Sequence, residues 1–217
     1  MITVSKHVEG MVKESPFVEE GLALGVINLT ALARKFKPQI ESKSLKRTSV
    51  GAIVMALQRL GLKLKQKSLK RKILMPNDVT VKSNLVEVTY INSQNLKHKH
   101  GQVLKIAEAR QDMFFNLLQG VFETCIIASG QLMEELQKTL KGEKLTSSIK
   151  DLASITLRFD EEAVYTPGAY YVILKNLAWE NINVIEVISI HNELSVIVED
   201  KKVEKAFSII NQLIKQR

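Results

Sequence analysis

The chain has 217 residues, of which 45% are hydrophobic and 25% are charged, and this composition excludes a largely disordered protein and fits one to three small domains. No apolar run approaches the roughly 20 residues that span a bilayer, and the N-terminus lacks the apolar core of a signal peptide, so we expect a cytoplasmic protein without membrane contact. The single cysteine, Cys125, lies in the apolar run VFETCIIAS, where we expect a buried structural thiol.

Basic residues are concentrated in the first third of the chain. Residues 1–72 contain 15 Lys and Arg against 5 Asp and Glu, whereas residues 73–217 contain 16 against 18. The net charge of +8 therefore comes entirely from the first segment. An acidic partner such as DNA would be sought there.

Helix signals open the first segment. Ser15 is placed to cap a helix that has Pro16 at its first position, and Gly25 is placed to end it. A second short helix is expected to begin after Asn28 as N-cap and to stop before Pro38.

A third helix is expected from about Ser49 to Gly61, with Gly61 as its stop. Its apolar stripe has helical spacing and consists of Val50, Ile53, Val54 and Leu57. The alternation of Leu and Lys at positions 62 to 65 then predicts the start of a basic strand. Three short helices followed by such a strand resemble a winged helix-turn-helix domain over residues 1–72.

A DNA-binding role for this segment would use the start of the third helix and the wing. The candidate nucleic-acid-binding residues are Lys46, Arg47, Thr48, Ser49, Arg59, Lys63 and Lys65, and Lys67, Lys70, Arg71 and Lys72 would follow the phosphate backbone from the wing. The alternative is a solvated basic face. The long connection ALARKFKPQIESKSLKRTS also fits poorly with the short turn of a helix-turn-helix.

The last third of the chain reads as strand, helix, strand, strand, helix. The first strand, SITLRF, has its apolar residues in alternation, and Thr166 is expected to cap the helix, with Pro167 at its first position. Strands NVIEVISI and ELSVIVE are joined by a tight turn at His191 and Asn192. The expected buried positions are Ile155, Leu157 and Phe159 in the first strand, Tyr170, Ile173, Leu174 and Leu177 in the first helix, and Val203, Ala206, Phe207, Ile210 and Ile214 in the closing helix.

The same order of elements recurs upstream. It consists of NLVEVTYIN, a helix over QVLKIAEARQ, the strands DMFFNLLQG and VFETCIIAS around Gly120, and the helix QLMEELQKTL. This repetition predicts two tandem domains, at residues 73–147 and 148–217. Each is small enough to need a packing neighbour, and NVIEVISI is apolar on both faces, so we expect one face to be covered by the other copy or by a second subunit.

The stretches SITLRF, TPGAYYVILKNLAWENINVIEVIS and ELSVIVEDKKVEKAFSIINQL resemble the ACT domain, the small regulatory domain that binds amino acids in aspartokinases. The resemblance implies an α+β protein in which an N-terminal helical, winged-helix-like domain is followed by tandem ferredoxin-like (βαββα) ACT domains. The first copy has HKHGQ in its loop where the second has Pro167 and Gly168, so the resemblance implies a ligand site in the second copy and not in the first.

The resemblance also implies a ligand site. A turn at Gly168 beside a helix start offers backbone N–H groups to a carboxylate, while Asn181 and Asn183 would meet an α-amino group. The full candidate set is Tyr165, Thr166, Pro167, Gly168, Ala169, Tyr170, Asn181, Ile182 and Asn183. Such sites often form between two ACT domains, so we expect a homodimer or a pair within the chain. The alternative is that Thr-Pro-Gly is only capping chemistry and that the domains only dimerise.

Catalytic motifs are absent from the sequence, which has no GxxxxGK[ST], GxGxxG, HExxH or CxxC. The four histidines are scattered, so we predict no metal site, no cofactor and no enzymatic activity. We therefore expect a non-catalytic regulatory protein that binds an amino acid, dimerises and controls transcription through residues 1–72. The alternative is a regulatory subunit or interaction module for an enzyme of amino-acid metabolism such as an aspartokinase.

Overall fold

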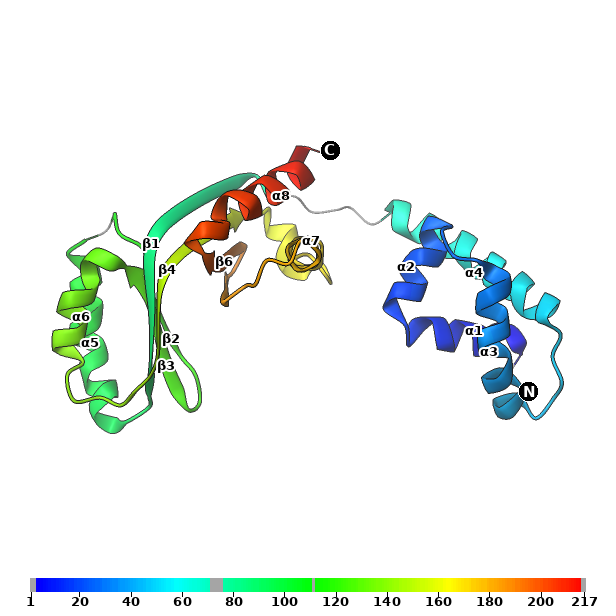
Figure 1. Ribbon diagram of the computed structural model, residues 1–217, viewed down its shortest axis with the longest axis horizontal. Coiled ribbons are helices and arrows are strands. Elements are labelled where there is room, and N and C mark those ends of the chain that lie inside the picture. The colour runs from blue at the N-terminus through cyan, green and yellow to red at the C-terminus, as the bar shows by residue number, and fades with distance from the viewer. Residues whose placement is uncertain (1–2, 71–75, 111, 216–217) are drawn as a thin grey trace. The chain divides into compact units, whose positions relative to one another are not determined.

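The computed structural model describes residues 3–70, 76–110 and 112–215. The chain divides into two compact units, Met1–Ile73 and Leu74–Arg217, whose elements are labelled in Figure 1. None of the helices in the described ranges is long and apolar enough to cross a bilayer.

The first unit is helical. Its elements are α1 (Val4–Lys13), α2 (Pro16–Leu24), α3 (Leu29–Ser44) and α4 (Val50–Lys70). All four helices contribute to one core, in which Val8, Ala33, Ile40, Ile53 and Leu57 are fully buried. Helix α2 has the predicted bounds, with Gly25 in the left-handed conformation (φ 74°) at its end, although the Ser15 side chain makes no capping hydrogen bond.

Helix α4 continues through Gly61, so the predicted helix stop at this glycine is wrong. A Cβ atom at Gly61 would lie 3.2 Å from the carbonyl oxygen of Leu22, so the missing side chain allows α2 and α4 to pack closely. The predicted strand at residues 62 to 65 is also wrong, because these residues are the continuation of α4. Within residues 3–70 the first unit has no strand and therefore no wing.

Helix α3 begins as predicted, since the Asn28 side chain accepts a hydrogen bond from the Ala31 amide at 3.0 Å. Its predicted end before Pro38 is wrong, because the helix runs on to Ser44. A proline in a helix interior removes one hydrogen bond and costs about 3 kcal/mol. Here Phe36 and Ile40, on either side of the exposed Pro38, are both buried, and their packing offsets that cost.

The second unit is α+β and repeats one order of elements twice, as predicted. The first half contains β1 (Asp78–Ile91), α5 (Gln94–Glu108), β2 (Phe115–Gln119), β3 (Glu123–Ser129), the 3-10 turn η1 (Gly130–Leu132) and α6 (Met133–Thr139). The second half contains β4 (Leu145–Arg158), the 3-10 turn η2 (Glu161–Tyr165), α7 (Tyr171–Trp179), β5 (Glu186–Ile190), β6 (Glu193–Glu199), the 3-10 turn η3 (Asp200–Lys202) and α8 (Val203–Lys215). The strands form one antiparallel sheet in the order β2-β3-β1-β4-β6-β5.

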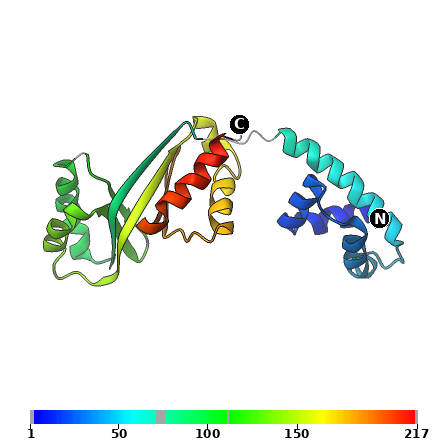
Figure 2. The ribbon, with the colours of Figure 1, turned by 45° about the horizontal axis from the view of Figure 1, so that its top comes forward.

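The long strands β1 and β4 are shared by the two halves and run side by side in Figures 1 and 2. The C-terminal part of β1, from Leu85, pairs with β3, and the C-terminal part of β4, from Leu152, pairs with β6. Just before these points Asn84 (φ 58°) and Asp151 (φ 55°) adopt the left-handed conformation, and the β1–β4 register shifts nearby. The predicted boundary at residues 147 and 148 falls inside β4, a strand that both halves use.

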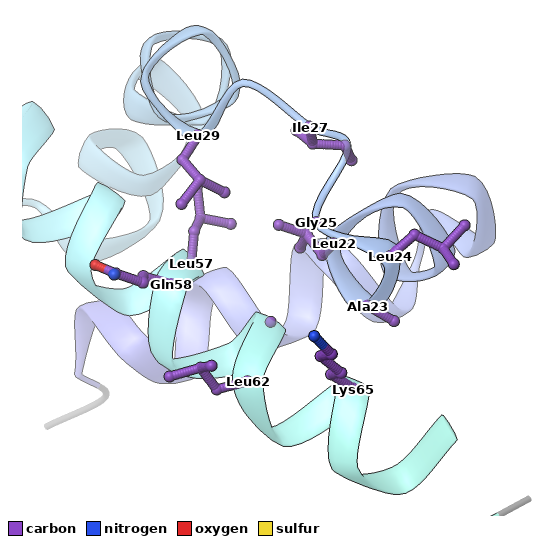
Figure 3. Close-up of a pocket in the computed structure, with 11 residues that line it drawn as sticks. Leu22, Ala23, Leu24, Gly25, Ile27, Leu29, Leu57, Gln58, Leu62 and Lys65 are labelled. Atoms are coloured by element: carbon purple, nitrogen blue, oxygen red, sulfur yellow. The ribbon is translucent and has the colours of Figure 1, made fainter. Parts of the chain in front are cut away.

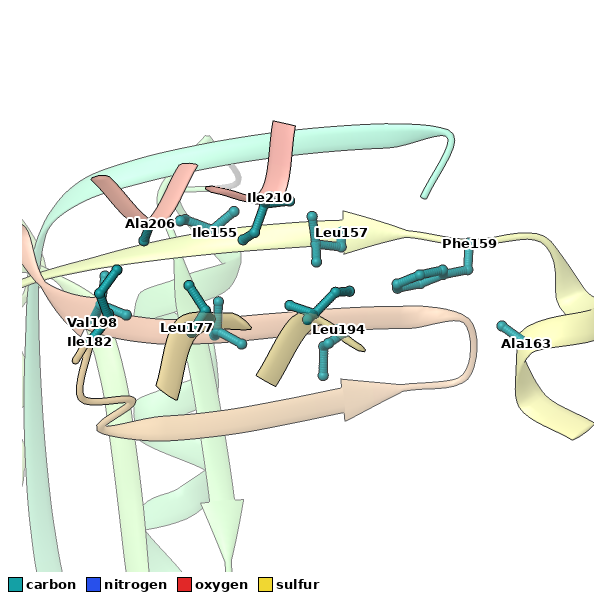
Figure 4. Packing of buried hydrophobic residues seen from close by; sticks show 12 residues of the cluster. Ile155, Leu157, Phe159, Ala163, Leu177, Ile182, Leu194, Val198, Ala206 and Ile210 are labelled. Atoms are coloured by element: carbon teal, nitrogen blue, oxygen red, sulfur yellow. The ribbon is translucent and has the colours of Figure 1, made fainter. Parts of the chain in front are cut away.

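Helices cover one face of the sheet in each half. Helices α5 and α6 bury Val88, Tyr90 and Ile126, among others. In the second half the predicted alternation is confirmed, because Ile155 and Leu157 of β4, with Phe159 just after the strand, pack against α7 and α8 (Figure 4). The closing helix buries Ala206 and Ile210, whereas Phe207 remains 37% exposed and lies off the buried stripe.

The opposite face of the strands carries a third core, which we call the shared face. Its buried members come from both halves and are Leu85, Ile127, Leu152, Ile188 and Ile197. Strand β5 has apolar residues on both sides, and its residue Ile188 is buried here in one cluster with Leu85 and Ile127 of the first half. The shared face therefore joins the two halves into one unit.

Candidate functional site

The loop between β4 and α7 differs from its predicted form. The Thr166 hydroxyl donates to the Glu162 carbonyl at 2.8 Å, so Thr166 ends η2 and does not cap α7. Helix α7 begins only at Tyr171. The physical reason is Gly168, whose φ of 78° is incompatible with a right-handed helix and delays its start.

Some backbone amides in this loop donate hydrogen bonds within the loop and others do not. The Ala169 amide donates to the Thr166 carbonyl at 3.2 Å, and the Tyr171 amide donates to the Gly168 carbonyl at 3.0 Å. Among the described residues, the amides of Gly168 and Tyr170 have no such acceptor. These two N–H groups are therefore available to an outside acceptor.

A hollow of about 350 Å³ lies beside this loop. Its lining residues are Ala163, Val164, Thr166, Gly168, Ala169, Tyr170, Tyr171, Ser189 and His191. The Tyr170 and Ser189 hydroxyl oxygens are 3.2 Å apart, and the Tyr170 ring packs at 5.6 Å, centroid to centroid, against the buried Phe159 ring. The loop is thus tied to β5 on one side and to the core on the other.

Four of the nine predicted ligand residues line the hollow, namely Thr166, Gly168, Ala169 and Tyr170. Tyr165 is 84% exposed, and neither it nor Pro167 is among the lining residues.

Three further predicted ligand residues, Asn181, Ile182 and Asn183, lie beyond the far end of α7, whose nine residues extend about 13 Å. Ile182 is buried in the core, and the Asn181 amide donates to the Ala178 carbonyl at 3.0 Å. The structure therefore does not bring these residues to the hollow of the same chain.

Ser189 and His191 also line the hollow and were not predicted. His191 occupies the β5–β6 turn with a left-handed φ of 51°, at the position where the sequence predicts a tight turn. What the sequence did not give was the position of that turn beside the loop after β4, because this depends on strand order. The hairpin β5–β6 folds back along β4, and its turn meets the end of that strand.

The predicted nucleic-acid residues occupy different environments in the helical unit. Ser49 caps α4 by accepting from the Ala52 amide at 3.2 Å, and Thr48 is 8% exposed with its amide bound to a Glu41 carboxylate oxygen at 2.8 Å. Thr48 is therefore not accessible to DNA. Lys46, Arg47, Arg59, Lys63 and Lys65 are exposed, the last three on a helix instead of a wing. The side chains of Lys67 and Lys70, together with the whole of Arg71 and Lys72, lie outside the described residues.

A second hollow, of about 240 Å³, lies between α2 and α4 of the helical unit (Figure 3). Leu22, Leu24, Leu57 and Leu62 are among its lining residues, and Lys65 is the one charged side chain among the described residues that line it. Its walls are mainly apolar, which is unlike the basic surface that phosphate groups need.

Comparisons with known proteins agree with the predicted fold. No family model matches the chain, and no curated protein matches it. Solved structures do match. The regulatory subunit of aspartate kinase from Thermus thermophilus aligns with a TM-score of 0.51 at 16% identity over 65% of this chain and 98% of that one. The corresponding subunit from Thermus flavus aligns with a TM-score of 0.51 at 15% identity, over 65% and 98%.

An aspartate kinase matches over a smaller share of its own chain. The aspartate kinase of Clostridium acetobutylicum aligns with a TM-score of 0.51 at 18% identity, over 65% of this chain but only 36% of that one. The α+β unit holds the strand and helix order expected of paired ACT domains, so we assign these matches to it. Residues 74–217 have the fold of the regulatory domains of aspartate kinases, as the resemblance in the sequence predicted.

Proposed function

We propose that this protein is a non-catalytic regulatory protein whose α+β unit binds an amino acid in the hollow beside Thr166–Tyr170. The observation that carries the proposal is the convergence of unpartnered amides at Gly168 and Tyr170 with the side chains of Ser189 and His191. The fold shared with regulatory subunits of aspartate kinases supports it.

The chemistry of the hollow suits a small zwitterion. N–H groups beside a helix start attract a carboxylate, because they are hydrogen-bond donors near the positive end of a helix dipole. The Tyr170 and Ser189 hydroxyl oxygens would accept from an ammonium group. A volume of about 350 Å³ lies at the lower end of the range for small-molecule sites, as expected for an amino acid.

We further propose that Asn181, Ile182 and Asn183 act across an interface. Because they lie at the far end of α7, they would reach a ligand only if a second copy of the domain supplied them. This keeps the expected homodimer in the proposal. It also predicts that Asn183→Ala changes affinity only under conditions in which the protein is dimeric.

The direct test is thermal unfolding of the full chain with each of the twenty amino acids. A ligand at about 100 times its Kd stabilises the native state by about 2.7 kcal/mol, which raises Tm by roughly 5 to 11 °C for a domain of this size. Gly168→Val should abolish the shift, because it places a branched side chain in the hollow.

The matched control for this experiment is Gly142→Val. Gly142 also has a positive φ, of 89°, and does not line the hollow, so this variant has the same backbone strain without obstructing the site. We expect it to unfold at a lower temperature but to keep the ligand-induced shift. If no amino acid shifts Tm of the wild type, or if Gly168→Val responds as Gly142→Val does, the proposal is wrong.

A second candidate function is that of a regulatory subunit for a separate enzyme. It is favoured by the match to 98% of the Thermus thermophilus regulatory subunit, which is itself a separate chain. The test is size-exclusion chromatography with a purified aspartate kinase from which the regulatory domains have been removed. Co-elution that responds to the effector amino acid supports this function, and separate elution under all conditions contradicts it.

The alternative to an enzyme partner is that the protein controls transcription, with residues 1–72 binding DNA and the α+β unit binding the amino acid. Its support is the basic excess and the exposure of Arg59 and Lys63, which lie one turn apart on α4. Retention on DNA should weaken steeply with salt, and Arg59→Ala with Lys63→Ala should lower the slope against log salt by about 2. A slope that the same pair of changes leaves at its wild-type value contradicts DNA binding through α4.

A further inference from the structure

Glu87, Cys125 and Glu186 come together on the shared face, although they belong to three different strands. Glu87 lies on β1, Cys125 on β3 and Glu186 on β5, and one ligand atom of each lies within 4.8 Å of the others. Within the β1–β3 ladder Cys125 is paired with Thr89, two residues from Glu87 and on the same face. Glu186 comes from the other half of the unit.

The central member of this cluster is a buried carboxylate without a partner. Glu87 is only 5% exposed, and its Oε2 atom has no hydrogen-bond partner among the described residues. A buried carboxylate is costly unless it is paired or binds a cation. In the part of the chain that the structure describes, no hydrogen-bond partner is placed at this oxygen, whereas a thiol sulfur and an oxygen of a second carboxylate lie within 4.8 Å of a Glu87 carboxylate oxygen.

Burial and neighbouring charge also suppress the ionisation of Glu87 and Cys125. Burial and the neighbouring Glu186 raise the pKa of Glu87. Burial and the charge of Glu87 raise the pKa of Cys125 to about 12. A cation between them would reverse this effect, because all three groups would then bind it in their charged forms.

The repeat shows that the fold does not require these residues. Strands β1 and β4 have 14 residues each, and end-to-end alignment places Glu87 against Ser154. Strands β3 and β6 have 7 residues each, and their alignment places Cys125 against Ser195. The second half thus builds the same two strands with serines, so the acid and thiol of the first half serve something other than the sheet.

We propose that Glu87, Cys125 and Glu186 form a binding site for a divalent metal ion of borderline softness, with Zn²⁺ as the best fit. One thiolate and two carboxylates are three ligands of types that Zn²⁺ accepts, and they leave one tetrahedral position for water or for an exogenous ligand. Bond lengths of about 2.0 to 2.3 Å place tetrahedral ligand atoms roughly 3.3 to 3.8 Å apart, so small side-chain rotations complete the site.

Such an ion would link the two halves of the α+β unit. Two of its ligands come from the first half and one from β5 of the second, and β5 also contains Ser189, which lines the hollow of the candidate amino-acid site. The metal site is nevertheless independent of that proposal, since none of its ligands lines the hollow. The sequence analysis did not predict this metal site, because its three ligands are far apart along the chain and form no motif.

The experiment uses Co²⁺ as a spectroscopic probe for Zn²⁺. The full-length protein is treated with a chelator and titrated with Co²⁺, while the thiolate-to-cobalt charge-transfer absorption and Tm are followed. We expect one Co²⁺ per chain, a charge-transfer band, a rise in Tm, and loss of the band when Zn²⁺ is added. Cys125→Ser should remove the band, and Glu87→Gln should weaken Co²⁺ binding at least about 10-fold.

Two controls separate ligation from folding. Glu134→Gln removes a carboxylate from α6, where it is exposed and paired with Lys138, and it should bind Co²⁺ as the wild type does. Metal-free Glu87→Gln should unfold at or above the wild-type temperature, because it removes an unpaired buried charge. The proposal is overturned if the wild type gives no charge-transfer band, or if folded Glu87→Gln binds Co²⁺ with wild-type affinity.

Discussion

The two halves of the α+β unit share a framework but differ in what they carry. Their long strands have the same length, the left-handed residues Asn84 and Asp151 fall at the same point, and Leu85 and Leu152 follow directly and pair with each other. These are the features that bend the sheet and pack the shared face. The two halves therefore share the left-handed position and the buried leucine on which the sheet depends.

The differences lie in the loops and in polar positions. In the first half only Asn92 and Ser93 separate β1 from α5, because Ser93 caps the helix by accepting from the Leu96 amide at 2.9 Å. The second half has residues 159–170 between β4 and α7, and this longer loop forms the hollow. The first half instead supplies Glu87 and Cys125, two of the three members of the Glu87 cluster, so the two halves contribute to candidate sites of different kinds.

The largest expected effect tests the shared framework. Leu85→Ala and Leu152→Ala each remove a fully buried side chain from the shared face, and each should lower the free energy of unfolding by about 2 to 5 kcal/mol. Because both residues belong to the same cluster, the double variant should lose less than the sum of the two. Urea unfolding of the three variants measures this. Additive losses would show that the halves are stabilised separately.

Sequence reasoning succeeded where local pattern decides the structure. The alternation in SITLRF, the turn at His191 and the hairpin around Gly120 depend on neighbours along the chain, and all three are confirmed. It failed where tertiary packing overrides a local signal. Pro38 and Gly61 are helix breakers in isolation, yet burial of Phe36 and Ile40 and the close approach of α2 keep both inside helices.

The candidate sites were harder to predict than the fold. HKHGQ was expected in a loop but lies within α5, since Ser93 begins that helix earlier than the apolar stripe suggests. Helix α1 was not predicted at all, although Thr3 caps it by accepting from the Lys6 amide at 3.4 Å. Ser189, His191 and the Glu87 cluster depend on strand order, which no local spacing reveals.

The next prediction compares how Glu87 and its counterpart Ser154 affect the pH dependence of stability in the metal-free protein. Because the folded-state pKa of Glu87 is raised, its carboxyl contributes stability below the unfolded pKa of about 4.3, and that contribution is lost as pH rises through the folded value. Glu87→Gln should therefore have the same free energy of unfolding as the wild type at about pH 4 and a higher one at about pH 8, because the glutamine stays neutral at both.

Ser154→Ala is the control for this pH dependence. The Ser154 hydroxyl is buried and, among the described residues, has no hydrogen-bond partner, but it does not titrate. Urea unfolding should therefore show the same change in the free energy of unfolding for Ser154→Ala at both pH values. A gain from Glu87→Gln that is equally independent of pH would mean that Glu87 is not a charged, unpaired group in the metal-free fold.

The smallest effect concerns the polar pair that each half carries on its paired strands. In the second half the Thr156 and Ser195 hydroxyl oxygens are 2.7 Å apart, and in the first half Thr89 contacts Cys125 at the corresponding position. Thr156→Val should cost about 1 kcal/mol, because it leaves the buried Ser195 hydroxyl without its partner. Thr89→Val should lower the free energy of unfolding by about half as much, since a thiol forms weaker hydrogen bonds than a hydroxyl.

Guanidinium unfolding of both variants compares the two losses of stability. Equal losses would indicate that Cys125 depends on Thr89 as strongly as Ser195 depends on Thr156. In the metal-bound protein the cost of Thr89→Val should fall further, because the Cys125 sulfur would then be held by the ion.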